Sequence, residues 1–124
     1  MGGRVLVVED DLVIRDTLLE ILADAGYEAI GAANGLEALA RLREPGGLPC
    51  LIVLDIMMPV MDGVTFRQEQ LRLPELAGIP VVVLSAHRTS AELVDDLGVR
   101  DVLPKPVRLA QLLCVVHRFC GLGA

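Results

Sequence analysis

Asp55 directly follows a run of four apolar residues, Leu51-Ile52-Val53-Leu54, and this position could place a reactive carboxylate at the end of a strand. A short apolar, partly β-branched run bounded by turn-forming residues is typical of a fully buried strand. In open α/β sheets, reactive groups gather at the carboxyl ends of the strands. Met58-Pro59 ends this strand, and Asp62 can cap a helix that begins near Gly63. Because Asp is also a common turn residue, the position alone leaves a purely structural role open.

A second acidic group, Glu9-Asp10-Asp11, follows the apolar residues 5–8 in the same way. If Glu9, Asp10 and Asp55 lie together, they repel, and one takes up a proton unless a cation neutralises them. Mg²⁺ suits such a site because it binds oxygen ligands through one or two carboxylates and keeps waters and phosphate oxygens. The alternative is that the acidic group only caps the first helix. We assign that role to Asp11, and metal binding to Glu9 and Asp10.

The order of the predicted elements indicates how these residues are positioned. Strands are predicted at residues 5–8, 27–32, 50–54, 81–84 and 99–103. Helices are predicted at residues 12–25, 36–42, 63–71, 90–97 and from Arg108 onward, with loops at 45–49 and 73–80. Five apolar strands alternating with five helices predict an α/β fold, with a parallel sheet covered on both faces. The flavodoxin-like strand order 2-1-3-4-5 fits this length.

In this strand order, the first and third strands flank the crevice at the topological switch point, where the strand order reverses. The strand ends then bring Glu9, Asp10, Asp55, Ser85 and Lys105 to one place. Lys105 stands between two prolines at a strand end, which is an unusual place for a solvated surface lysine. Ser85 is also consistent with a turn or helix cap.

Residues 55–63 read D-x-x-M-P-x-M-D-G. This segment resembles the phosphoacceptor segment of two-component response-regulator receiver domains, chemotaxis regulators among them, at every named position. The resemblance extends over essentially the whole chain. It implies that Asp55 accepts a phosphoryl group from a phosphohistidine of a sensor histidine kinase or a histidine phosphotransfer protein. It also implies Mg²⁺, with Mn²⁺ as a substitute, ligated by Asp10, Asp55 and the Met57 backbone carbonyl, and by Glu9 through water.

The resemblance implies further roles around Asp55. Lys105 would pair with the Asp55 carboxylate and then with a phosphoryl oxygen, while Ser85 would donate its hydroxyl to another. Phosphoryl transfer needs alignment and neutralisation of oxygens more than it needs a base. A cis Lys105–Pro106 bond is typical of the family. His87 and Met57 lie at the mouth of the site in the family and tune the rates; a surface His87 without a role is an equal alternative.

Two departures from the family pattern lie in the part of a receiver domain that transmits the signal to its target. Receiver domains usually carry Tyr or Phe three residues before the lysine, where this chain has Val102. Valine has few rotamers and no ring to swing, so an aromatic switch is not available. Residues 85–98 also form a segment about two residues shorter than is usual in the family. The shorter segment predicts a fourth helix that is short, shifted or mobile.

Composition sets limits on the class of protein. A chain of 124 residues fits one domain, residues 1–124, with a core of ordinary size. Its net charge of −6 disfavours nucleic-acid binding, which needs a basic face. No apolar run is long enough to span a bilayer, and Met1-Gly2-Gly3-Arg4 lacks the apolar stretch of a signal peptide. We therefore expect a cytoplasmic protein that binds neither nucleic acid nor membrane.

The three cysteines, Cys50, Cys114 and Cys120, have an odd count and no C-x-x-C spacing. That pattern argues against a disulfide framework and against a zinc site. Cys50 opens an apolar strand and Cys114 lies in an apolar helix, so we expect buried, inert thiols. The last helix is expected to bury a single apolar stripe: Leu109, Leu112, Leu113, Val116 and Phe119.

The leading interpretation is a phosphoacceptor signalling domain and not an enzyme. It would assist its own Mg²⁺-dependent phosphorylation and dephosphorylation, and act on an unknown partner protein or output domain. An aspartyl-phosphate hydrolase would use the same nucleophile and ion, but such enzymes place a second Asp where this chain has Met57. A receiver-shaped interaction module that works without phosphorylation is the other alternative. Val102 and the short fourth helix favour it, and the five intact site residues oppose it.

Overall fold

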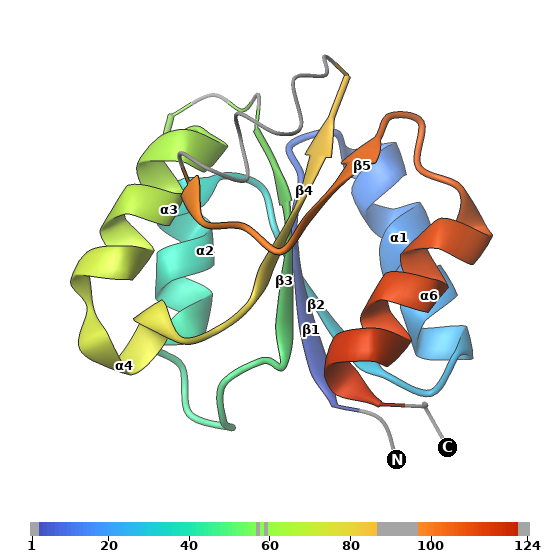
Figure 1. Cartoon of the computed structure of the whole chain (residues 1–124), viewed down its shortest axis with the longest axis horizontal. Coiled ribbons are helices and arrows are strands. Elements are labelled where there is room, and N and C mark those ends of the chain that lie inside the picture. The colour runs from blue at the N-terminus through green and yellow to red at the C-terminus, as the bar shows by residue number, and fades with distance from the viewer. Residues whose placement is uncertain (1–2, 57, 59, 87–96, 122–124) are drawn as a thin grey trace.

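The computed structural model describes residues 3–56, 58, 60–86 and 97–121, and a five-stranded parallel sheet lies at its centre (Figure 1). The strands are β1 (Arg4–Val8), β2 (Glu28–Ala32), β3 (Leu51–Asp55), β4 (Val81–Ser85) and β5 (Asp101–Pro104). Their order is β2-β1-β3-β4-β5, as predicted. The register places Asp55 beside Leu84 and Ser85 beside Pro104. The strand ends therefore share one edge, called the carboxyl edge below, and the strand starts share the amino edge.

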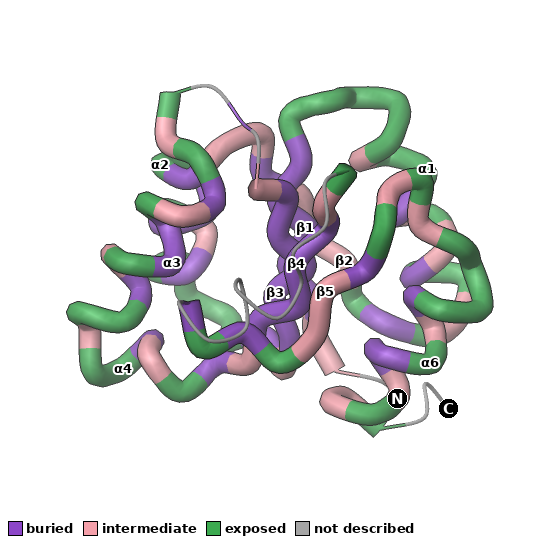
Figure 2. The backbone as a smooth tube through the Cα atoms, turned by 45° about the horizontal axis from the view of Figure 1, so that its top comes forward, coloured by how far each residue is buried: buried purple, intermediate pink, exposed green. Residues whose placement is uncertain are grey.

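Helices cover both faces of this sheet (Figure 1). The helices are α1 (Leu12–Asp24) and α6 (Leu109–Cys120) on one face, and α2 (Gly35–Leu42), α3 (Gly63–Arg72) and α4 (Pro74–Ala77) on the other. Alternate strand residues point to opposite faces of the sheet and belong to two separate cores. In β1, Leu6 and Val8 belong to one core, and Val5 and Val7 belong to the other. The three central strands, β1, β3 and β4, are accordingly buried almost throughout (Figure 2), as their apolar runs predict, whereas the edge strands β2 and β5 are mostly half-buried. No helix in the described part of the chain is long and apolar enough to cross a membrane.

Three helices begin at capping side chains, which orient them from the carboxyl edge of the sheet. Asp11 accepts a hydrogen bond from the N–H of Ile14 at 3.0 Å, as predicted for a capping residue. Asn34 and Asp62 cap α2 and α3 in the same way, each at 2.9 Å. Each cap satisfies an N–H that the first turn of the helix leaves without a partner.

Two predictions about the helices were wrong. Residues 73–80 contain α4, which Pro74 starts, because its missing N–H is not needed in a first turn. Leu109 is 54% exposed, because α6 turns Leu112, Val115 and Val116 toward the core instead. The helix predicted at 90–97 lies outside the described residues except for its last residue.

A buried polar pair on α3 joins that helix to distant segments. Arg67 is 5% exposed and Gln70 is fully buried. The Arg67 guanidinium donates to the carbonyls of Leu97 and Gly98 at 2.9 and 3.1 Å, and to Gln70 Oε1 at 2.7 Å. The Gln70 amide donates to two carbonyls at α4 and just before β4. Burial, and then the charge of Arg100, lower the pKa of Arg67. The network positions the chain entering β4 and β5 against α3.

The expectation of buried, inert thiols without a disulfide, made from the positions of Cys50 and Cys114, was wrong. Cys50 and Cys120 form a disulfide, with their Cα atoms 5.4 Å apart, and Cys114 is exposed. The sequence places Cys50 just before β3 and Cys120 at the end of α6, and only the packing of α6 across the sheet brings them together. Cys114 lies on the side of α6 away from its buried residues.

Candidate functional site

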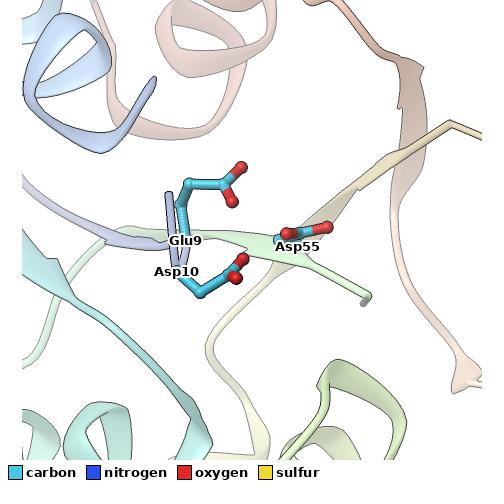
Figure 3. A group of neighbouring side chains, drawn as sticks. All are labelled: Glu9, Asp10 and Asp55. Atoms are coloured by element: carbon cyan, nitrogen blue, oxygen red, sulfur yellow. The ribbon is translucent and has the colours of Figure 1, made fainter. Parts of the chain in front are cut away.

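The ends of β1 and β3 bring three carboxylates together. Figure 3 shows Glu9 and Asp10, just after β1, reaching toward Asp55 at the end of β3. One oxygen from each of these side chains lies within 4.8 Å of the other two. Glu9 and Asp55 are buried, whereas Asp10 is exposed. The predicted meeting of these carboxylates is therefore present in the fold.

Lys105, the only lysine in the chain, follows β5 and enters the same cluster. Its Nζ lies 3.1 Å from Asp55 Oδ2 and 3.1 Å from Glu9 Oε1. Its backbone N–H donates to the carbonyl of Ser85 at 3.0 Å, which continues the pairing of β5 with β4. The Lys105–Pro106 peptide bond is cis, as predicted. The alternative of a solvated surface lysine is excluded by these two ion pairs.

The surroundings of Glu9 disfavour the charged form of its carboxyl group. Burial, a hydrogen bond shared with Asp55 and the charge of Asp55 raise the pKa of Glu9 to about 7. The N–H of Asp11, 3.3 Å from Glu9 Oε2, and the Lys105 ammonium act against this rise. Burial lowers the pKa of Lys105, but its pairs with Asp55 and Glu9 outweigh that effect and the net shift is upward.

The remaining predicted residues have different outcomes. Ser85, the last residue of β4, is half-buried at the carboxyl edge, next to the strand end that carries Asp55. Val102 lies in β5 opposite Val83 and packs, half-buried, against the core that faces α2 and α3. His87 and Met57 lie outside the described residues.

Comparison with known proteins decides the family. Residues 5–117 match the response regulator receiver domain family. The chain belongs to this family. It is 38% identical over 115 residues to the response regulator MprA of Mycobacterium bovis (strain BCG / Pasteur 1173P2). That match covers 91% of this chain and 48% of the relative, so the chain spans about half the length of the curated relatives it matches.

Solved receiver domains have the same fold. The chemotaxis response regulator CheY4 of Vibrio cholerae is 30% identical, with a TM-score of 0.86 and coverage of 96% of this chain and 99% of that one. The receiver domain of the sensor histidine kinase PA1611 from Pseudomonas aeruginosa PAO1 is 26% identical, with a TM-score of 0.83 and coverage of 96% and 98%. That protein has a magnesium ion coordinated in its active site cleft.

The donor set of this receiver domain suits a hard divalent cation. Three carboxylates face one ammonium, which leaves excess negative charge in a partly buried place. Oε1 of Glu9 is buried, and the ammonium with which it pairs, that of Lys105, is shared with Asp55. Carboxylate oxygens are the ligands that Mg²⁺ prefers, and Asp10 leaves one side open to solvent.

Sequence reasoning missed one residue that positions the segment around Asp55 in this receiver domain. A Cβ at Gly63 would lie 2.6 Å from the carbonyl oxygen of Asp55 and 2.8 Å from the Cα of Ile56. The Gly63 N–H also donates to the Ile56 carbonyl at 3.0 Å. The start of α3 can therefore approach Asp55 this closely only because residue 63 lacks a side chain. The Asp-Gly pair that closes the motif was the signal in the sequence.

Proposed function

We propose that this receiver domain accepts a phosphoryl group on Asp55 from the phosphohistidine of a sensor histidine kinase or a histidine phosphotransfer protein. The observation that carries this proposal is the position of Lys105 Nζ, 3.1 Å from an oxygen of Asp55 and within the three-carboxylate cluster. An Asp carboxylate so placed keeps a nucleophilic oxygen at the carboxyl edge, where a phosphorylated partner can approach.

These positions support the following reaction. An Asp55 oxygen forms a bond to phosphorus as the bond between phosphorus and the imidazole nitrogen of the donor breaks. Lys105 leaves its Asp55 pair to neutralise one phosphoryl oxygen, and the Ser85 hydroxyl donates to another. Mg²⁺, or Mn²⁺ in its place, supplies the remaining positive charge when bound. Asp10, Asp55 and the backbone carbonyl of Met57 would hold the ion directly, and Glu9 through water.

A groove beside Lys105 gives the phosphodonor a place to dock. It has a volume of about 480 Å³ and is lined by α1 residues Val13, Ile14 and Thr17 and by Lys105-Pro106-Val107. Val13 is 74% exposed, which leaves apolar surface at the mouth of the groove. Because Lys105 belongs to both groove and site, a partner helix seated there would reach Asp55. We therefore assign this groove to the phosphodonor.

The output of the domain acts through a separate protein or through a further domain. The chain spans about half the length of its curated relatives. Val102 carries no aromatic ring, so the output of this domain does not use rotation of a ring at that position. We place the domain, residues 1–124, in the cytoplasm, with neither nucleic acid nor membrane as its partner. Met57 and His87 would tune the lifetime of the phosphoryl group.

Intact mass tests the function. The protein is incubated with Mg²⁺ and acetyl phosphate, with the Asp55→Asn variant and an EDTA sample alongside. One added phosphoryl group, absent from the variant and from EDTA, is the expected result. Labelling that survives in EDTA would overturn the metal assignment. Labelling of neither protein, together with failure to bind beryllofluoride, would instead favour an interaction module that works without phosphorylation.

A further inference from the structure

We propose that Cys50 and Cys120 form a reversible redox pair that anchors the end of α6 to the start of β3. This pair lies at the amino edge of the sheet, whereas the phosphoacceptor cluster lies at the carboxyl edge. The inference goes beyond the proposed phosphotransfer and does not depend on it. It adds a second input to the domain, which is the redox state of its surroundings.

Packing contacts beside the disulfide hold α6 against β3. Leu112, Val115 and Val116 of α6 are buried in the same core as Leu51 and Val53 of β3. Next to the disulfide, the Tyr27 hydroxyl contacts both His117 and the carbonyl of Gly121, which holds the last turn of α6. The two thiols would therefore remain adjacent after reduction, and an adjacent pair re-forms its bond readily.

The residue that precedes β1 lies close to the disulfide, and its small size leaves space for the two sulfur atoms. A Cβ at Gly3 would lie 2.7 Å from the Sγ of Cys50 and 3.9 Å from the Cβ of Cys120. The absence of a side chain at residue 3 leaves room for the sulfur atoms where β1, β3 and α6 meet.

The fold does not need this bond as a staple. Small domains rely on disulfides when they cannot bury a sufficient core, and this chain buries two cores on opposite faces of a sheet. Cys50 and Cys120 are both partly exposed residues, which places the pair near the protein surface, where small reagents approach. Cys114 is exposed, with its side chain on another side of α6, and takes no part. A bond that is reachable and dispensable is suited to reversible use.

The chemistry balances with a low-molecular-weight disulfide of the glutathione type as the oxidant. One protein thiolate attacks this disulfide, forms a mixed disulfide and releases one small thiol. The other protein thiol then displaces the second small thiol, and the Cys50–Cys120 bond forms. The protein loses two protons and two electrons, and the oxidant becomes two thiols. Excess small thiol reverses both steps.

The test counts free thiols. The native protein is equilibrated in buffers of varied ratio of reduced to oxidised glutathione, quenched in acid, unfolded and labelled with N-ethylmaleimide for intact mass. We expect three labels on the reduced chain and the loss of two as the buffer becomes oxidising, with Cys114 labelled throughout. The Cys114→Ser variant should still lose two labels, and the Cys50→Ser variant should lose none. Three labels at every ratio, or one label at every ratio, would overturn the proposal.

Hydrogen exchange tests the anchoring. Oxidation should slow amide exchange in the last turn of α6, and leave the peptide that contains Glu9 and Asp10 unchanged. Reduced wild-type protein provides the comparison, so the result does not depend on a variant that folds. Equal exchange of α6 in the two redox states would contradict the anchoring role.

Discussion

The two edges of the sheet hold opposite kinds of chemistry. At the carboxyl edge, Glu9 and Asp55 are buried beside Lys105, with Asp10 close by. Like charges therefore accumulate at this edge and make it responsive to cations and protons. At the amino edge, the end of α6 is held by the Cys50–Cys120 bond and by neutral contacts of Tyr27.

This contrast teaches how one sheet separates reaction from anchoring. Because the edges lie at opposite ends of the same strands, an ion or a proton should act at the carboxyl edge, and a thiol reagent at the amino edge. A change at one edge should therefore leave the chemistry of the other edge unchanged.

Replacing the lysine should remove the reaction and leave the disulfide intact. Lys105→Met eliminates the only ammonium within reach of Asp55, so phosphorylation by acetyl phosphate should slow by about 100-fold or more. The thiol titration should match that of the wild-type protein. Arg108→Met, which removes an exposed cation three residues away, is the matched control and should react normally. A shifted thiol titration in Lys105→Met would mean that the two edges are coupled.

A methyl group should have opposite effects at two glycines. Gly63→Ala forces a Cβ against the Asp55 carbonyl, so the free energy of unfolding should fall by about 1–3 kcal/mol. Gly78, which precedes β4 at the amino edge, has helical backbone angles and open space around it. Gly78→Ala should raise the free energy of unfolding by up to about 1 kcal/mol, because alanine restricts the unfolded chain. Chemical denaturation measures the free energy of unfolding of both variants. An equal decrease in the two would show that contact of a Cβ with the Asp55 carbonyl is not the cause of the loss at residue 63.

The pH dependence of stability should arise at the carboxyl edge. The pKa of Glu9 is about 7 in the folded protein against 4.5 without burial, so the folded state holds the proton more tightly. The contribution of Glu9 to stability is therefore fully present below pH 4.5 and is lost as the pH rises through about 7, which lowers the free energy of unfolding by roughly 2 kcal/mol after allowance for solvent screening.

Urea denaturation at several pH values, without and with Mg²⁺, measures this effect. Glu9→Gln carries no titrating proton and should flatten the profile, and saturating Mg²⁺ should do the same for the wild-type protein. A wild-type profile that is already flat without Mg²⁺ would show that Glu9 is not held as the structure indicates.

The smallest effect is expected in the loop that follows Asp55. Val60 has a φ of 68°, in the left-handed region that β-branched residues avoid, and its side chain is 76% exposed. Val60→Gly relieves this strain without loss of packing. It should raise the free energy of unfolding of the protein by about 1 kcal/mol. Thermal unfolding measures the change. A loss of stability would mean that the valine side chain has a contact partner.

Local pattern and topology were sufficient to predict much of this protein. The apolar runs that end in Glu9, Asp55 and Ser85 predicted three of the strands, and the capping roles of Asp11 and Asp62 followed from side-chain chemistry. These predictions succeed because they depend on neighbouring residues. The strand order then brought Lys105 to Asp55, since the ends of parallel strands share an edge.

Local sequence pattern was enough to show which side chains could react, because strand ends and turn residues are encoded locally. Tertiary structure alone decided the other features: the Cys50–Cys120 bond, the burial of Arg67 and Gln70, and the raised pKa of Glu9. Each depends on segments far apart in the chain. A cysteine in an apolar strand and an arginine on a helix have the same local pattern whether or not a partner packs against them. The partner is set by how α6 and the chain entering β5 lie against the sheet, and no local pattern carries that information.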